Sequence, residues 1–429
     1  MTNIVKSFSL SQKLNPLQIG YYLLLLLVFC LPLNKKILPY IFACIILNWV
    51  IGLRLGTNFK SIFKNKYLLL FLSFYMLHLI GILYSHDLYY GANDVLLKLS
   101  LFIFPIVIFE TINYSWDKVY KLLFSFVIGC FAACIICLIH SMIIYPIRKD
   151  LIVFFYGDLS FIHHPGYFSM YLNFVNVILL YFTFLSDSSR TKITTILSCL
   201  LIVFFSVFIL LLNSKTGIIV SLLIYCIALL YYYLHFKKGF IVLATIIGIG
   251  LFFFSIQHYV TKPVNPRFLK PEVMIQDEHK TIDKQTTEST SVRILIWGSA
   301  MEIIKQNLLF GVGTGDVKDV LLDKYKEKGM TGALNERLNA HDQFLQTFIA
   351  LGLPGILLLF SSLVFPLIAA LRKWNFIYIT FLIIIFINFL TESMLETIAG
   401  VIFYALFNSL LMVNMYRKEL SLKYHLLQD

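Results

Sequence analysis

The stretch 291–355 holds the side chains best suited to chemistry. Arg293 precedes Trp297 by one helical turn, so the indole could stack on the guanidinium or anchor at lipid headgroups. A guanidinium offers phosphate oxygens a planar fork of donors, although an Arg at a membrane surface can also simply meet lipid phosphates. His341 begins an apolar run, and we expect Asn339 to cap a helix that starts there. The positive end of a helix disfavours imidazolium, so His341 is either a proton acceptor or an interfacial side chain that hydrogen-bonds a neighbour.

Lys215 stands in the short sequence NSKTG between two long apolar runs. A cation in such a place is costly unless it meets an anion. Glu392 and Glu396 lie one helical turn apart on the side where we expect Lys215, so the three could pair. The alternative is a lysine that only extends its ammonium group to the membrane surface.

Two further motifs could contact a substrate. The sequence GVGTGD contains Gly311 and Gly313 just before an expected helix, so its backbone N–H groups could bind an anion. The motif lacks the residues of a nucleotide-binding loop, and a tight turn is the other explanation. His163 and His164 precede Pro165 and are expected at the same outer surface. No carboxylate or Cys lies at ligand spacing from them, so we expect neither a metal ion nor another cofactor.

The elements that must position these residues are membrane helices. Of 429 residues, 59% are hydrophobic and 14% are charged, against about 25% charged in a soluble domain. The apolar residues form blocks of roughly 17 to 25, the length of a spanning helix. We therefore predict an all-α, polytopic transmembrane bundle. The net charge of +12 is assigned to short loops, as orientation signals are, rather than to a nucleic-acid partner.

The hydropathy pattern predicts about twelve spans, with the first retained rather than cleaved. The expected spans are 17–33, 37–54, 67–84, 95–110, 119–145, 165–185, 193–212, 216–234, 240–257, 343–371, 375–391 and 397–415. Spans 1–9 occupy 1–257, a large and mostly helical loop fills 258–342, and spans 10–12 with a tail complete 343–429. Short-loop Lys and Arg residues place both termini in the cytoplasm and the loop outside. All seven Cys fall inside expected spans, which gives no disulfide or zinc framework.

Within the large loop, residues 258–290 are polar, and a helical pattern begins at Ser291. Val292, Leu295, Ile296, Ser299 and Ile303 can share one face of that helix. A second, charged helix is expected over 316–328. Because Pro354 and Gly355 interrupt the next apolar run, 341–352 should form a half-helix before the true span.

Taken together, these motifs resemble the O-antigen ligase and polymerase superfamily of bacterial inner membranes. The resemblance rests on RILIWGSA, LLFGVGTGD, AHDQFLQTFIALGLPG and LLLNSKTGIIVSLL, together with a plan of about twelve helices and one late outer loop. It covers roughly 211–360, and the first 160 residues agree in hydropathy only. Where the superfamily usually has Arg, this chain has Lys215, which keeps the charge without the bidentate fork.

The resemblance implies a metal-independent, inverting glycosyltransferase that moves a glycan from an undecaprenyl-diphosphate carrier to an acceptor hydroxyl. His341 would be the general base, and Arg293 and Lys215 would hold the diphosphate. Trp297, Gly311, Gly313, His163, His164 and Glu392 would contact substrates. The acceptor is expected to be the lipid A core, as in a ligase, with a polymerase or a protein O-oligosaccharyltransferase as alternatives. A transporter of lipid-linked sugars is an alternative of another class, and it would need charges deep in several spans.

Overall fold

The computed structural model describes residues 15–53, 66–112, 115–186, 191–236, 248, 283–287 and 289–425. Every regular element in these ranges is a helix. The α-helices are α1 (Pro16–Cys30), α2 (Leu38–Leu53), α3 (Lys66–Ile82), α4 (Leu88–Lys98), α5 (Ser100–Ile112), α6 (Trp116–Arg148), α7 (Tyr156–Leu159), α8 (Pro165–Leu180), α9 (Lys192–Leu211), α10 (Lys215–Phe236), α13 (Ser289–Gln306), α14 (Val317–Glu327), α15 (Thr331–Asn335), α16 (Gln343–Arg372), α17 (Phe376–Phe389) and α18 (Ile398–His425). Short 3₁₀ or π turns cover Leu151–Phe154, Tyr181–Leu185 and Met394–Glu396.

Within the described residues, six helical stretches are long and apolar enough to cross a membrane, and shorter apolar helices lie among them. Their ends agree with the expected spans to within a few residues for most of the described chain, which confirms the all-helical membrane class. The fourth expected span is longer than predicted and is two helices, α4 and α5, which meet at Leu99. The ninth expected span, 240–257, lies outside the described residues apart from residue 248. The total of about twelve crossings therefore stays a prediction.

Aromatic side chains hold the centre of the bundle. Phe126 from α6, Phe174 from α8 and Phe407 from α18 meet there, with ring centroids 4.9 Å apart for both the Phe126–Phe407 and Phe174–Phe407 pairs. All three rings are fully buried. Each such ring buries a large apolar area and prefers tilted or edge contacts, so the cluster fixes the relative positions of three helices. Along the same bundle α18 also packs against α5.

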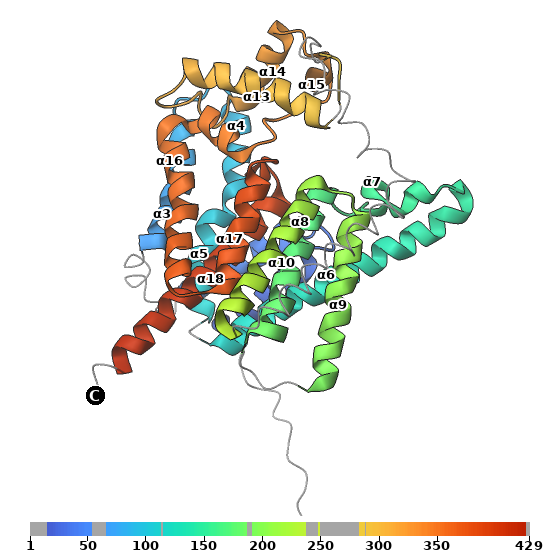
Figure 1. Cartoon of the computed structure of the whole chain (residues 1–429). Coiled ribbons are helices and arrows are strands. Elements are labelled where there is room, and N and C mark those ends of the chain that lie inside the picture. The colour runs from blue at the N-terminus through green and yellow to red at the C-terminus, as the bar shows by residue number, and fades with distance from the viewer. Residues whose placement is uncertain are drawn as a thin grey trace, which may run out of the picture.

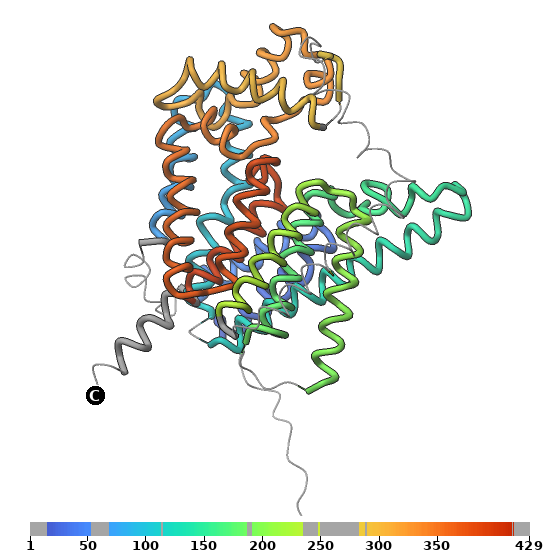
Figure 2. The backbone as a smooth tube through the Cα atoms, viewed as in Figure 1, coloured from blue at the N-terminus to red at the C-terminus, as the bar shows by residue number. Residues whose placement is uncertain are grey.

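Helices α13, α14 and α15 form a layer over one end of the bundle, above α3, α4 and α16 (Figure 1, Figure 2). The layer has its own core, in which Val292, Ile296 and Ile303 of α13 pack with Leu321 and Tyr325 of α14. The amphipathic face predicted for the helix after Ser291 is thus confirmed, and the charged helix expected over 316–328 is α14.

The loop between α13 and α14 is joined to a break in α16. Val312 N–H donates to the Ile349 carbonyl at 2.8 Å, and Leu353 N–H donates to the Leu308 carbonyl at 3.0 Å. Gly352 has φ 61° and ψ −152°, a backbone conformation open almost only to glycine. A Cβ there would lie 2.4 Å from the Leu309 carbonyl oxygen. The predicted half-helix is confirmed: α16 begins with a short segment that bends at Gly352, and this bend anchors the outer layer.

Candidate active site

His341 lies just outside α16, and the predicted helix start was wrong. Asp342 caps the helix, accepting from Leu345 N–H at 2.9 Å, so the first helical residue is Gln343. His341 itself has φ 46°, a left-handed conformation that no helix interior uses. Asn339 does not cap the helix; its Oδ1 accepts from the His341 N–H at 3.0 Å. The ring therefore projects from a turn and not from the first turn of α16.

Trp297 positions this turn. Its Nε1–H donates to the carbonyl of Ala340 at 3.1 Å. This hydrogen bond connects α13 to the residue that precedes His341, although Trp297 and Ala340 are 43 residues apart in the sequence. This hydrogen bond gives Trp297 a positioning role, and its contact with substrate stays a prediction.

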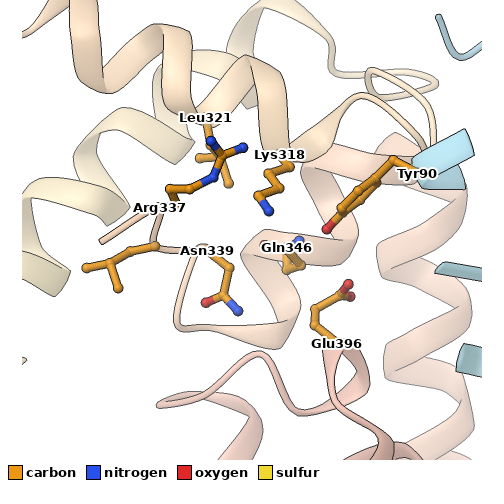
Figure 3. A pocket seen from close by; sticks show the side chains of 8 residues that line it. Tyr90, Lys318, Leu321, Arg337, Asn339, Gln346 and Glu396 are labelled. Carbon is orange, nitrogen blue, oxygen red and sulfur yellow. The ribbon is translucent and has the colours of Figure 1, made fainter. Parts of the chain in front are cut away.

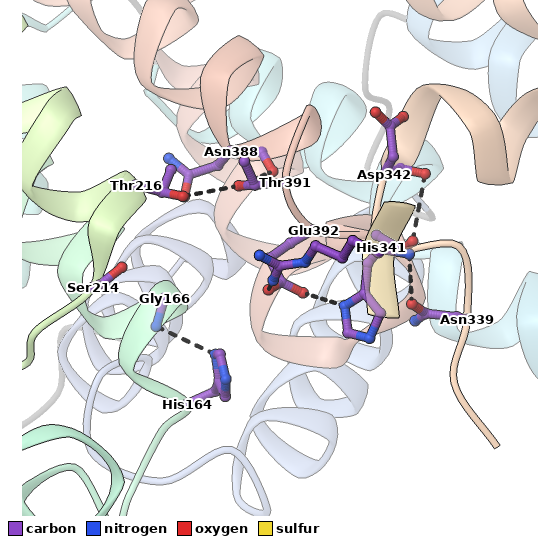
Figure 4. Close-up of polar contacts among 12 residues, drawn as sticks. His164, Gly166, Ser214, Thr216, Asn339, His341, Asp342, Asn388, Thr391 and Glu392 are labelled. Carbon is purple, nitrogen blue, oxygen red and sulfur yellow. Dashed lines mark hydrogen bonds and ion pairs between the residues drawn. The ribbon is translucent and has the colours of Figure 1, made fainter. Parts of the chain in front are cut away.

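Glu392 joins Arg293 and His341, and Figure 4 shows its contact with His341. Arg293 Nη2 donates to Glu392 Oε1 at 2.6 Å, and His341 Nδ1 lies 3.2 Å from Glu392 Oε2. Glu392 comes from the turn between α17 and α18, so three distant parts of the chain meet here. The expected pairing of Glu392 with Lys215 is wrong, because Arg293 and His341 take both carboxylate oxygens.

The ionisation of Glu392 determines which nitrogen of the His341 ring carries a proton. Burial is the strongest influence on Glu392 and would raise its pKa, but the hydrogen bond from His341 and the charge of Arg293 together hold the pKa below its usual value. An ionised carboxylate only accepts hydrogen bonds, so Nδ1 of His341 must carry the proton. In the neutral ring Nε2 then holds a lone pair. The side chains of Arg293 and His341 keep 21% and 23% of their surface exposed, which lets a substrate reach both.

Lys215 lies beside this cluster and not in it. It is exposed at the first position of α10, and its Nζ donates to Thr290 Oγ1 at 3.5 Å. The next residue, Thr216, donates to Thr391 Oγ1 at 3.3 Å, beside Glu392 (Figure 4). The start of α10 is therefore held near both Arg293 and Glu392, and the ammonium group stays accessible.

The Gly-rich motif serves as a turn. Gly311 has φ 70° and Gly313 has φ 98°. Their N–H groups donate to the Asn307 and Ala350 carbonyls, each at 3.0 Å. Since these amides are used inside the protein, they are not free to bind an anion, and the tight-turn explanation holds.

The two neighbouring histidines differ in their surroundings. His163 is buried against Tyr171, and burial lowers its pKa to about 4. It is therefore not at the surface where a substrate contact was predicted. His164 is exposed at the start of α8, where its Nδ1 accepts from Gly166 N–H at 3.2 Å. Figure 4 shows it on the same side of His341 as Glu392, and its charge is one of the influences that lower the pKa of Glu392. In the described ranges no group of three His, Cys, Asp or Glu residues could hold a metal ion.

A second charged cluster was not predicted. Lys98, 1% exposed, donates to Glu396 at 3.0 Å and also pairs with Asp94. The sequence does place Asp94 and Lys98 one turn apart, a spacing that allows pairing. Nothing local links Lys98 with Glu396, which is 298 residues away. Glu396 thus pairs with Lys98 and not with Lys215, and burial raises its pKa to about 7 even though Lys98 opposes that rise.

The arrangement can remove a proton and bind an anion at one place. A neutral imidazole with a free Nε2, oriented by a carboxylate, is the usual form of a general base. Arg293 and Lys215 supply cationic donors that can stabilise charge developing on a leaving group.

A family model described as O-antigen ligase matches residues 200–360, a segment that includes Lys215, Arg293 and His341. No curated protein matches the chain. The matched segment runs from the second half of α9, through the outer layer, to the first part of α16. It supports a membrane glycosyltransferase of the ligase or polymerase type. The match of residues 200–360 to the O-antigen ligase family model confirms the resemblance of this chain to the O-antigen ligase and polymerase superfamily.

Proposed function

We propose that this protein is an O-antigen ligase, which transfers a glycan from undecaprenyl diphosphate to a hydroxyl of the lipid A core. The observation that carries the proposal is the chain of contacts from Arg293 through Glu392 to His341. It lies at the end of the bundle covered by α13–α15, which we assign to the periplasmic side of the inner membrane. The donor lipid would lie among the spans, with its diphosphate at the surface.

In this mechanism His341 Nε2 takes the proton from the acceptor hydroxyl as its oxygen attacks the anomeric carbon. The new glycosidic C–O bond forms while the bond from that carbon to the diphosphate breaks. The electron pair of the broken bond goes to undecaprenyl diphosphate, and Arg293 and Lys215 stabilise its charge. One displacement inverts the anomeric configuration. The proton remains on His341, where the ionised Glu392 stabilises imidazolium.

The location of the charged groups favours an enzyme over a transporter. A carrier of lipid-linked sugars needs ionisable groups along a path through several spans. Among the described residues, Arg293 and His341 pair with Glu392, and Lys98 pairs with Glu396; both carboxylates lie in the turn between α17 and α18. Both clusters therefore lie at one end of the bundle.

The test is reconstitution of the purified protein in vesicles with an undecaprenyl-diphosphate-linked glycan. Lipid A core, a second donor molecule and a Ser- or Thr-containing peptide are offered in parallel, with the His341→Ala protein as control. We expect glycan on the lipid A core and none with the variant. Glycan on the second donor would make the protein a polymerase, and glycan on the peptide would make it a protein-glycosylating enzyme. Movement of the donor across the bilayer without transfer would make it a transporter.

A further inference from the structure

A cavity of about 160 Å³ lies between the outer layer and the bundle, on the other side of the His341 turn. By the usual requirement of about 10–15 Å³ for one water, it has room for on the order of ten water molecules. Figure 3 shows side chains from α4, α14, α16 and two turns pointing into it. The lining residues are Tyr90, Lys318, Leu321, Arg337, Leu338, Asn339, Gln346 and Glu396.

Two cations on this lining have no acidic partner. Lys318 and Arg337 form no ion pair within the described residues, although Lys324 of α14 and Lys328 just after it do pair with Glu302. Lys318 Nζ lies 5.7 Å from the centre of the Tyr90 ring. An unpaired ammonium and guanidinium at one cavity attract an anionic ligand, and the guanidinium can bind it through two hydrogen bonds.

The cavity wall around Glu396 is polar, and its positive and negative charges nearly cancel. Glu396 and Asp94 both pair with the buried Lys98. Counting Lys318, Arg337 and Lys98 against these two carboxylates leaves one net positive charge. Gln346 uses Oε1 to accept from Ala340 N–H at 3.2 Å, and its NH₂ group stays available.

The other lining groups suit hydroxyls. The Tyr90 hydroxyl, the Gln346 amide and the Glu396 carboxylate offer donors and acceptors within one small space. Figure 3 shows the ends of the Tyr90 and Glu396 side chains turned toward Gln346. A ligand with several hydroxyl groups and one negative substituent would satisfy both halves of this lining.

The cavity adjoins the candidate general base. Asn339 lines it and also accepts the His341 N–H at 3.0 Å. Thr216 and His164 lie on one side of His341, and Asn339 lies on the other (Figure 4). The donor diphosphate, proposed to bind at Lys215 and Arg293, would therefore approach His341 from the side away from the cavity.

We propose that this cavity binds a sugar residue of the acceptor that carries a phosphate or carboxylate substituent. Lys318 and Arg337 would hold the anionic substituent, and Tyr90, Gln346 and Glu396 would hold the hydroxyls. The assignment of this sugar to the acceptor rests on the proposed glycosyl transfer. The binding of the sugar to the cavity does not rest on that transfer, because the cavity and its charged side chains are present whether or not the protein transfers a glycan.

Direct binding tests the proposal on the purified full-length protein in nanodiscs of uncharged lipid. The probes are glucose 6-phosphate, glucose and inorganic phosphate, each titrated by calorimetry or ligand-observed NMR. We expect glucose 6-phosphate to bind about tenfold or more tightly than either of the others, as loss of a charge-assisted bond implies. Equal binding of glucose and glucose 6-phosphate would overturn the proposal. Inorganic phosphate binding as tightly as glucose 6-phosphate would overturn it too, since sugar recognition would be absent.

Variants locate the binding. The Lys318→Gln, Arg337→Gln double variant should lose the preference for glucose 6-phosphate, and the charge-keeping Lys318→Arg, Arg337→Lys protein should retain most of it. Lys326→Gln is the matched control, because Lys326 is an exposed lysine of α14 that does not line the cavity. Undiminished binding by the double Gln variant would place the sugar elsewhere and sink the proposal.

A transfer assay separates this proposal from the proposed function. With a phosphorylated acceptor, the double Gln variant should raise the acceptor KM about tenfold while donor affinity stays constant. If the protein transfers no glycan but the probes bind in the expected order, the proposed function fails and the sugar site stands. If transfer proceeds and probe binding ignores charge, the sugar site fails and the proposed function stands.

Discussion

Glu392 is the residue on which the candidate site depends. It reaches Arg293 with one oxygen and His341 with the other, and its ionised form fixes which imidazole nitrogen carries the proton. The residue types and their helical spacing were enough to single out Arg293 and His341. Glu392 was singled out as well, but its pairing with Arg293 and His341 could not be predicted, because separations of 99 residues from Arg293 and 51 from His341 leave no local pattern.

Lys215 gives a prediction at the residue scale. Its ammonium is exposed beside the Arg293 cluster and has no acidic partner in the described chain, so a donor phosphate would be its anion. Lys215→Ala should lower the transfer rate on the order of 10²–10³-fold, as removal of one charge-stabilising donor does. Lys215→Arg should keep much of the activity.

The measurement is the initial rate of glycan transfer in vesicles at saturating acceptor. Lys192→Ala is the control, because Lys192 is an exposed lysine at the far end of the helix that leads to Lys215. A fully active Lys215→Ala protein would reduce Lys215 to a turn residue.

At the scale of elements, α16 shows how far local sequence signals predict where a helix begins and where it breaks. Pro354 and Gly355 indicated a break in its apolar run, and a break does occur nearby, at Gly352. The expected cap at Asn339 was wrong because Asp342 can also cap, and the turn between them is held by tertiary contacts such as the hydrogen bond of Trp297 to Ala340. Polar residues before a helix therefore predict that a helix starts, and tertiary contacts decide at which residue.

Gly352 gives a prediction for this element. Its backbone lies in a region that costs other residues about 1–3 kcal/mol, and a Cβ would meet the Leu309 carbonyl. Gly352→Ala should therefore lower the unfolding temperature of the purified protein and loosen the outer layer. Gly298→Ala is the matched control, since its Cβ would meet nothing within 4 Å and Ala favours a helix by up to about 1 kcal/mol. An unfolding temperature for Gly352→Ala equal to that of the unsubstituted protein would contradict this account of the break.

For the whole molecule, hydropathy predicted the helical plan because each spanning helix must satisfy its own backbone hydrogen bonds in lipid. The lengths of individual helices were harder to predict from hydropathy. Helix α6 has 33 residues, which is about 50 Å of helix, and so it extends well beyond a hydrocarbon core of about 30 Å. The contact of Lys98 with Glu396 also lay beyond prediction, since packing of α4 against the turn after α17 creates it. The apolar composition of a segment predicts whether it is buried. Which buried charges contact each other depends on how the helices pack.

The orientation of the bundle is a prediction at this scale. The asymmetry of Lys and Arg in short loops places the outer layer in the periplasm and the end of α16 in the cytoplasm. A cysteine at Glu336 should react with a membrane-impermeant maleimide in right-side-out vesicles. A cysteine at Arg372 should react only after the vesicles are opened, and the unsubstituted protein reports the background from native cysteines. The reverse labelling pattern would contradict the assigned orientation.

The central claim is that His341, oriented by Glu392, removes the proton from the acceptor. Single-turnover transfer and donor affinity are measured separately on folded, purified His341→Ala and Glu392→Gln proteins. The account predicts that both substitutions slow transfer by about 10²–10⁴-fold, the usual contribution of a positioned general base, while His341→Ala leaves donor affinity unchanged. A folded His341→Ala protein that transfers glycan at the wild-type rate would contradict it.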